Sequence, residues 1–216
     1  VKDYPNVSAQ VDGREVMTFV EDWSSPPRVS FDKDLKRYDP GQGQISIVAP
    51  TDFTEETWQL NFTGFTVEEI NSLENFFLRH AGKCREFWRS TRQDDISVRE
   101  RIDTEGTFIK AEGLDIFRTY ADDPTHRAVE IERNDGTFFR ARVTSIEEGE
   151  DLIGLFSRLN LSTEAGEDVE LEDIKRASWL LLCTFASDAA SFEYLTDGKA
   201  LSSLPVRSTY VEDDDE

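Results

Sequence analysis

Short runs in which apolar and polar residues alternate recur along this chain, and turn-forming residues bound them. In the run 57–62, Trp58, Leu60 and Phe62 share one face, and the runs 129–133 and 137–143 flank an Asp-Gly turn. Alternation with a period of two is typical of half-buried β-strands, and Asp-Gly between two such runs favours a hairpin. No β-α-β rhythm and no internal repeat occurs. The sequence therefore predicts a mainly β fold, a β-sandwich or barrel.

Other segments are predicted as strands because they alternate or carry an apolar run between turn residues. They are 28–31, 44–48, 84–89, 107–110, 114–120, 178–186, 191–195 and 200–206, and 152–161 is predicted as a strand or irregular segment. The continuous apolar run 178–186 is expected to be the most buried strand, since such a run suits the centre of a sheet. Residues 1–28 are polar and are expected to form an extended arm or irregular lead-in.

One segment has a helical pattern instead. Thr66 and Glu69 have the spacing of a capping box, in which each side chain accepts a hydrogen bond from the backbone N–H of the other residue. The apolar positions that follow repeat with a period near 3.6: Ile70, Leu73, Phe76 and Phe77. Gly82 is a natural stop. We expect one amphipathic helix over about 66–81, with one face packed on a sheet.

The net charge of the chain limits the kinds of partner that it is expected to bind. There are 45 acidic and 24 basic residues, a formal net charge of −21. Wrapping a nucleic acid needs a basic surface, and an anionic membrane repels an acidic protein. DNA could still pass along an acidic wall without sticking to it. The chain has no apolar run long enough to span a membrane and no signal-peptide layout at its start, so we expect synthesis in the cytoplasm and no membrane binding.

Residues that could carry chemistry are few or scattered. Cys84 and Cys183 cannot form a four-cysteine metal site and are expected to be buried free thiols, with a disulfide as the alternative. His80 suits the end of a helix, and His126 is expected in a polar loop without a second histidine nearby. We therefore predict no catalytic, cofactor-binding or metal site, and interpret the chain as a protein other than an enzyme.

Two chemical alternatives stay open. The acidic segment 164–173 is expected to be a solvated loop, but it supplies oxygen ligands for calcium, although without EF-hand spacing. A pair of carboxylates, Asp94 and Asp95, could serve a cell-wall hydrolase if a cleft held them at the separation that glycoside hydrolysis needs.

The stretch 73–96 carries a more specific arrangement. A helix ends in Phe-Phe, a basic turn of small residues follows, and Phe-Trp enters a strand that ends in Asp-Ile. The run 143–145 and the strand around residue 179 add weaker matches downstream. Together these features resemble distal tail proteins in the tail tip of long-tailed phages and gene-transfer agents. The residues that carry the resemblance, expected at an interface or in the core, are Phe76, Phe77, Gly82, Phe87, Trp88, Asp95 and Trp179.

The resemblance implies a structural subunit of the virion tail. Such a protein forms a ring, expected here as a hexamer, that joins the tail tube to the receptor-binding baseplate and lets DNA pass through its lumen. The implied partners are copies of the chain itself, the tail tube protein, the tape measure protein and the hub or baseplate protein. Phe87 and Trp88 are adjacent, so on a strand they face opposite ways, one into the core and the other onto the helix or a partner.

A second function and a second domain organisation remain open. A carbohydrate- or receptor-binding β-sandwich module would use exposed aromatic platforms, for which Trp23 and Trp88 are the candidates. The chain is expected to form one β-rich tail-type domain over 1–216. The alternative is an inserted or second β subdomain over about 104–176, because the charged stretch 97–105 resembles a linker.

Overall fold

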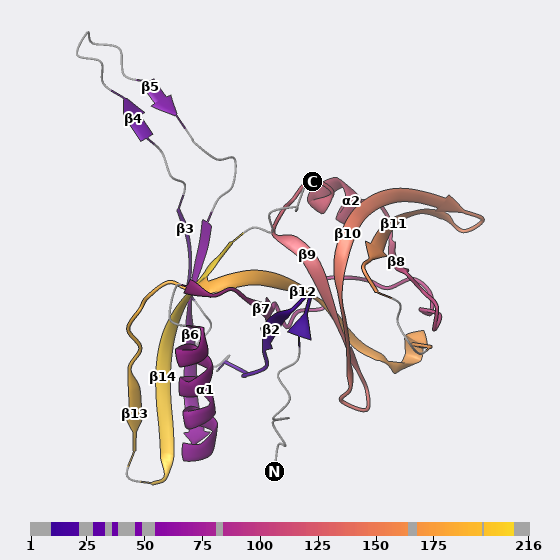
Figure 1. Ribbon diagram of the computed structural model, residues 1–216. Helices are drawn as coiled ribbons and strands as arrows, with labels where there is room; N and C mark the ends of the chain where they lie inside the picture. Colours follow the sequence, from indigo (N-terminus) through magenta and orange to yellow (C-terminus); the bar gives the residue numbers. More distant parts are fainter. Residues whose placement is uncertain are drawn as a thin grey trace. The chain divides into compact units, whose positions relative to one another are not determined.

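The computed structural model describes residues 10–21, 28–32, 36–38, 46–48, 55–80, 84–163, 168–195 and 197–209. The protein is mainly β, as the alternating runs predict (Figure 1). Its chain divides into two compact units. Unit 1 comprises Val1–Thr18, Phe87–Leu182 and Val211–Glu216, and unit 2 comprises Phe19–Glu86 and Cys183–Tyr210. The segment 104–176, proposed above as a subdomain, lies within unit 1.

Unit 1 is built on one sheet with the strand order β1-β2-β7-β12-β9-β10-β11-β8. From β12 to β8 each strand pairs antiparallel with the next, whereas β2 runs parallel to β7. The strands are β1 (Gln10–Val11), β2 (Arg14–Met17), β7 (Phe87–Ser90), β8 (Phe108–Glu112), β9 (His126–Arg133), β10 (Phe138–Asp151), β11 (Gly154–Leu161) and β12 (Ile174–Phe185). The boundary between the units falls within β12, after Leu182.

The segment 91–102 links the β8 edge of this sheet back to β12. Ile96 N donates a hydrogen bond to the Ala177 carbonyl of β12 (3.1 Å), and Arg99 N donates to the Lys110 carbonyl of β8 (2.8 Å). Part of the β8 edge is thereby paired with this segment, which shortens the open strand edge.

Trp88 anchors the core of unit 1. Its side chain is fully buried, and its indole Nε1 donates to the Val11 carbonyl (2.9 Å). It packs in a cluster of buried residues with Val11, Val16, Ala128, Leu180 and Leu182. The prediction of an arm or irregular lead-in over residues 1–28 is therefore wrong for 10–17. These residues form the β1–β2 hairpin, whose apolar side chains enter the core.

Unit 2 contains a second set of antiparallel strands, in the order β3-β6-β14-β13. Its strands are β3 (Arg28–Asp32), β4 (Lys36–Tyr38), β5 (Ser46–Val48), β6 (Glu55–Thr66), β13 (Phe192–Tyr194) and β14 (Lys199–Ser208). The end of β14 also pairs with residues 183–185 of β12, and β4 pairs with β5. The hairpin predicted from 191–195 and 200–206 is confirmed by β13 and β14.

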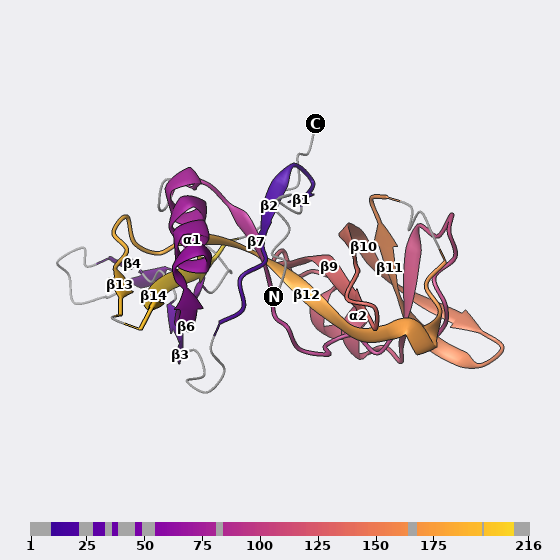
Figure 2. The same ribbon diagram turned by 90° about the horizontal axis from the view of Figure 1, so that it is seen from below.

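The helix α1 (Val67–Arg79) lies alongside β6 and β14 within unit 2 (Figures 1 and 2). The predicted capping box forms: Glu69 N donates to Thr66 Oγ1 (3.2 Å), and Thr66 N donates to Glu69 Oε2 (2.8 Å). The predicted apolar face is also the buried one. The Phe76 and Phe77 rings lie with their centroids 6.2 and 4.8 Å from that of Phe185. The helix prediction is therefore confirmed, with an end at Arg79 and a C-cap at His80.

A second helix was not expected. Residues 114–120 were predicted as a strand, but Asp115–Tyr120 forms the short helix α2. Gly113, at a φ of 66°, ends β8 and turns the chain, and Ser157 Oγ accepts the hydrogen bond of Phe117 N at the start of the helix (3.0 Å). A run this short fits both a period of two and a helical period, so tertiary contacts decide its conformation.

The long hairpin of β10 and β11 contains a glycine whose space a neighbouring ring occupies. Gly149 pairs with Phe156 across the two strands. A Cβ on Gly149 would lie 2.3 Å from Phe156 Cζ, well inside van der Waals contact. The Phe156 ring therefore covers the strand at the place where no side chain stands.

We predict that Gly149→Ala destabilises the protein by about 1–3 kcal/mol, because the methyl group overlaps the Phe156 ring. Urea unfolding measures the change. The matched control is Glu148→Ala, an exposed neighbour on the same strand, for which we expect a change within about 0.5 kcal/mol. In a Phe156→Ala background the cost of Gly149→Ala should largely disappear; an equal cost in both backgrounds would contradict this explanation.

Candidate functional site

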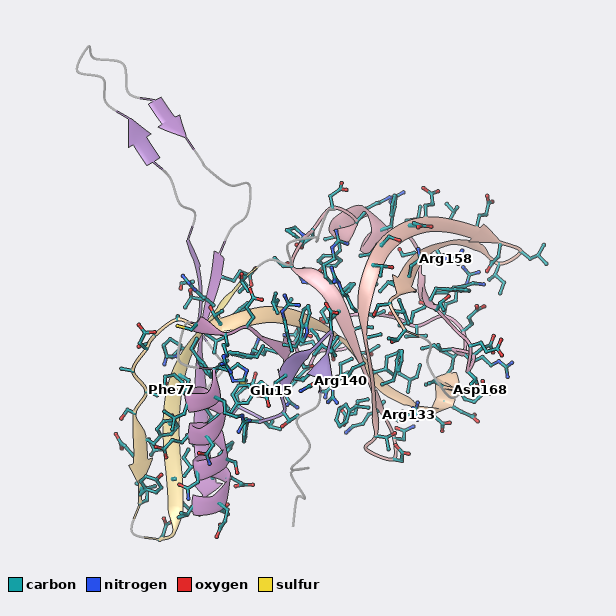
Figure 3. The ribbon with its side chains drawn as sticks, in the orientation of Figure 1. Glu15, Phe77, Arg133, Arg140, Arg158 and Asp168 are labelled. Carbon is teal, nitrogen blue, oxygen red and sulfur yellow. The ribbon has the colours of Figure 1, made fainter. Side chains whose placement is uncertain are left out.

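The residues that carry the family resemblance are mostly buried. Figure 3 labels Phe77 on α1. Phe76 and Phe77 are 3 % and 6 % exposed, Phe87 and Trp88 are fully buried, and Trp179 is 1 % exposed. Asp95 is half-buried, and Gly82 lies outside the described residues. In this chain the aromatic motif therefore belongs to the cores of the two units.

The burial of Trp88 bears on the carbohydrate-binding alternative. A sugar platform has to be accessible, so the prediction of an exposed ring at Trp88 is wrong. Trp58 and Trp179 are buried as well, as expected from their apolar strands. The other candidate platform, Trp23, lies outside the described residues.

Asp94 and Asp95 hold the backbone of β12. Asp94 Oδ1 accepts a hydrogen bond from Ala177 N (3.1 Å), and Asp95 Oδ2 accepts from Trp179 N (3.3 Å). Thr91 Oγ1 also donates to Asp95 Oδ2. Carboxylates that accept backbone amides serve to position a strand. The arrangement thus gives both aspartates a structural role, and it does not favour the hydrolase alternative.

One histidine and one carboxylate form a close pair in unit 1. His126 begins β9, whereas the sequence predicted a polar loop there. Its Nδ1 lies 2.8 Å from Asp123 Oδ2 and 2.8 Å from Thr125 Oγ1. The imidazole ring is tilted over Tyr120, with centroids 4.3 Å apart, and meets Trp179 edge-on at 5.4 Å. These contacts fix the ring against the core.

The same contacts shift the pKa of Asp123. Burial favours its neutral form, but the hydrogen bonds from His126 and Thr125 outweigh burial and lower the pKa from 3.8 to about 2. Asp123 is therefore an anion at neutral pH. The pair can support a charge-assisted hydrogen bond that stabilises the turn before β9.

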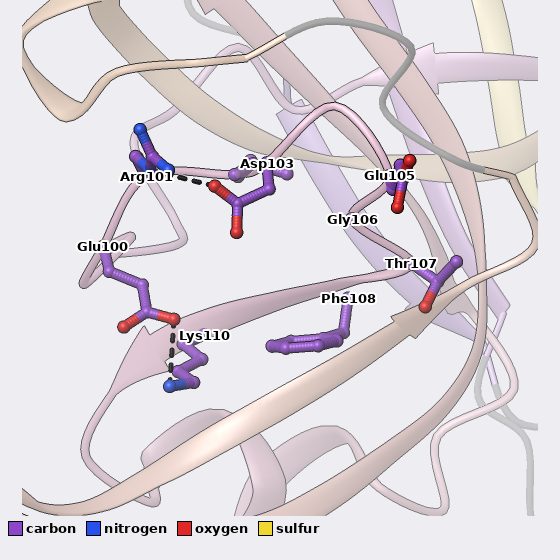
Figure 4. Close-up of a pocket in the computed structure, with 9 residues that line it drawn as sticks. Glu100, Arg101, Asp103, Glu105, Gly106, Thr107, Phe108 and Lys110 are labelled. Atoms are coloured by element: carbon purple, nitrogen blue, oxygen red, sulfur yellow. Dashed lines mark ion pairs between the residues drawn. The ribbon is translucent and has the colours of Figure 1, made fainter.

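A small pocket of about 240 Å³ opens at the turn that precedes β8 (Figure 4). Four of its charged groups form two ion pairs: Lys110 Nζ lies 2.9 Å from Glu100 Oε1, and Arg101 Nε lies 2.9 Å from Asp103 Oδ1. The hydrogen bond to Glu100 raises the pKa of Lys110, so its ammonium stays charged at neutral pH.

The acidic segment 164–173 lies next to this pocket where it is described. Asp168, labelled in Figure 3, accepts hydrogen bonds from Thr104 N and Thr104 Oγ1, both at 2.7 Å. Glu170 lies 3.6 Å from Arg101. Both acids therefore pair with residues of the turn before β8. Among the residues that the structure describes, no three His, Cys, Asp or Glu side chains gather to hold a metal ion.

The two cysteines have different environments. Neither forms a disulfide, and Cys84 is exposed whereas Cys183 is buried. The prediction of a buried Cys84 is wrong because β7 begins at Phe87, so residue 84 precedes the strand that enters the core. In the described part of the chain, no helix is long and apolar enough to cross a membrane.

No protein-family model matches the chain, and a search of curated proteins returns no match. The function therefore has to be argued from the fold, the surface and the resemblance that the sequence carries.

The surface feature that sequence reasoning missed is the tip of the β10–β11 hairpin. The tip residues Leu152 and Ile153 are almost wholly exposed, and Leu155 is about half exposed. The segment 152–161 was predicted as one strand or irregular stretch. The available signal was Gly154, which follows the two aliphatic residues and marks them as a two-residue loop between alternating runs.

We predict a specific contribution of Asp123 to acid stability. Its pKa is lower in the folded protein than in the unfolded chain, so its stabilising effect is fully present above about pH 4 and is lost as the pH falls toward 2. Asp123→Asn should cost about 1–2 kcal/mol at pH 6, and the difference from the original protein should shrink between pH 4 and pH 2. Urea unfolding at a series of pH values measures this difference. Asp122→Asn, at the exposed neighbouring position, is the control, and a gap that does not vary with pH would contradict the assignment.

Proposed function

We propose that this chain is a structural subunit of a phage tail tip, of the distal tail protein kind, which assembles with copies of itself into a ring. The observation that carries the proposal is the order of two described elements. The last turn of α1 contains Phe76-Phe77, and the strand β7 begins with Phe87-Trp88, in the order that the resemblance implies. The aromatic residues of these two elements contribute to the cores of both units.

The physical properties of the chain suit this role. A virion subunit works as a rigid spacer, and buried aromatic side chains with paired strands supply rigidity. In a ring each copy offers two different surfaces to its neighbours, because a heterologous contact repeated around an axis closes into a ring. The ring is expected to be a hexamer that contacts the tail tube, tape measure and hub or baseplate proteins.

The charge suits a passage for DNA. With a net charge of −21, a lumen built from copies of this chain repels phosphate rather than binding it. A duplex in transit would then meet a wall to which it does not adhere.

Self-assembly is the first test of this proposal. Light scattering over a wide concentration range should give a discrete oligomer, expected to have six copies, and electron microscopy of that species should show rings. A monomer at every concentration that is also missing from tails produced in the host would contradict the proposed function.

A second prediction concerns the binding of duplex DNA and is tested independently of self-assembly. Non-specific binding to phosphate is strongest at low salt. We expect the protein to show no detectable binding to duplex DNA even at low salt. Fluorescence anisotropy of a labelled duplex measures this. Tight binding at low salt that weakens as salt is added would show a basic DNA-binding surface and would contradict the proposed passive lumen.

A further inference from the structure

The tip of the β10–β11 hairpin carries the two most exposed large apolar side chains of the described residues. Asp151 and Gly154 form the last pair of the two strands, so Leu152 and Ile153 make the loop. Leu152 is fully exposed, Ile153 is 85 % exposed, and Leu155 beside them is 46 % exposed. Figure 1 shows β10 and β11 running side by side to this tip. Neighbouring apolar side chains that are exposed together commonly mark a binding surface.

The tip is also held in a fixed conformation. Asp151 Oδ1 accepts hydrogen bonds from Ile153 N (2.9 Å) and from Arg99 Nη2 (2.7 Å). Arg99 Nη1 in turn donates to the Gly154 carbonyl (3.2 Å). Gly154 has a φ of +130°, a conformation that residues with a side chain rarely adopt. A loop that is ordered before binding loses little entropy when it docks, so this tip has the properties of an anchor.

One face of the hairpin adds negative charge beside the tip. Leu155 is paired across the two strands with Glu150, and Glu148 stands two residues earlier on β10, so the three side chains share a face. Glu148 and Glu150 are exposed, and among the described residues neither carboxylate forms an ion pair. We call Leu152, Ile153, Leu155, Glu148 and Glu150 the tip surface.

Two bases near the tip lie on the opposite face of the hairpin. Arg99 and Lys110 both pair with Asp151, at 2.7 and 3.5 Å, and both stand over the Phe156 ring. Phe156 follows Leu155 on the strand and therefore points the other way. The negative charge of the tip surface is thus left for a partner to neutralise.

These properties define the chemistry of a partner. Aliphatic side chains are favourably buried against an apolar surface, and exposed carboxylates are complemented by lysine or arginine. An anionic lipid surface would repel the same carboxylates. The matching surface is therefore an apolar depression with basic residues at its edge.

The other exposed apolar residues of the described chain do not offer such a surface. Each of them has an acidic residue within four positions in the sequence: Val67, Leu78, Phe138, Leu171, Tyr194 and Leu195. The lysines and arginines within the same distance are already engaged, Arg79 over the Phe76 ring and the others in ion pairs with acids: Arg140, Arg142, Lys175 and Lys199. Docking the tip surface on the described surface of a second copy would therefore bring acid against acid.

We propose that the tip surface docks into an apolar depression, edged by lysine or arginine, on a protein other than a copy of this chain. Leu152, Ile153 and Leu155 enter the depression, and Glu148 and Glu150 meet the bases at its edge. The inference goes beyond the proposed function, because it concerns a contact with a different protein and not the contacts that close a ring.

The first experiment uses a probe with the chemistry of this partner, a fluorescein-labelled amphipathic helical peptide of leucine and lysine. Fluorescence anisotropy at about 0.15 M salt, where distant charges are screened, measures its binding. We expect the original protein to bind. Leu152→Ser/Ile153→Ser should weaken binding at least about tenfold, because two aliphatic side chains no longer leave water. Both residues are exposed, so the circular dichroism and melting curve of this variant should stay unchanged.

Leu171→Ser is the matched control. Leu171 is an exposed leucine of the same unit, and it stands between Glu170 and Glu172. This variant should bind the leucine–lysine peptide as the original protein does. Failure of the original protein to bind the peptide, or equal binding by Leu152→Ser/Ile153→Ser, would overturn the inference.

The second experiment tests the charges of the tip surface. Glu148→Lys/Glu150→Lys should weaken binding of the leucine–lysine peptide and create binding of a peptide in which glutamate replaces each lysine. Glu172→Lys/Asp173→Lys changes the net charge by the same amount outside the tip surface and should have neither effect. If the original protein binds both peptides equally well, the charges do not select the partner and the inference is wrong.

Two outcomes would assign the tip surface to another occupant. Self-association in sedimentation velocity that Leu152→Ser/Ile153→Ser abolishes would mean that a second copy covers it. Flotation with phosphatidylcholine vesicles that the same variant abolishes would mean that it binds lipid. Either result would overturn the inference. The proposed ring function fails separately, if the protein is a monomer at every concentration and is missing from tails, whatever the peptides bind.

Discussion

The burial of β12 is the constraint on which both units depend. Residues 177–185 of this strand are all buried, so a single continuous run supplies side chains to two cores. Leu180 and Leu182 pack with Trp88 in unit 1, whereas Phe185 packs with Phe76 and Phe77 in unit 2. A polar or shortened side chain in this run would leave a cavity or an unpaired group in a core, and such changes rank among the most destabilising.

The polar contacts around β12 also hold this strand in place. Ala177 N and Trp179 N donate to the carboxylates of Asp94 and Asp95. The carbonyls of Ala177 and Trp179 accept hydrogen bonds from the backbone N–H groups of Thr91, Asp95 and Ile96. The two aspartates that the sequence offered as a carboxylate pair are thus bound to the backbone of this strand. They position the strand, and the most exposed large apolar side chains of the described residues lie elsewhere, at the tip of the β10–β11 hairpin.

Local sequence signals predicted the elements whose formation is local. The Thr66–Glu69 capping box and the period of the apolar residues after it located α1, and the Asp-Gly turn located the β9–β10 hairpin. The apolar run 178–186 identified the buried strand, although β12 starts four residues earlier, at Ile174. In each case the residues that decide the structure are neighbours in the chain.

The predictions from the sequence were wrong where contacts with residues far away in the chain determine the local structure. The β1–β2 hairpin is ordered by Trp88 and Leu180, far away in sequence, so its few apolar residues looked like part of an arm. The apolar pattern of residues 114–120 fits both a strand and a helix. The hydrogen bond from Phe117 N to Ser157 Oγ accompanies the helix that forms. The hairpin tip could be recognised as a loop, but its exposure depends on how far β10 and β11 extend together, which the sequence does not state.

Electron cryomicroscopy of tails from particles that carry this chain tests the central claim most directly. The account predicts a closed ring of copies between the tail tube and the baseplate. In that ring acidic side chains should line the lumen. Tails without this chain, or a ring whose lumen is lined by basic side chains in contact with DNA, would contradict it.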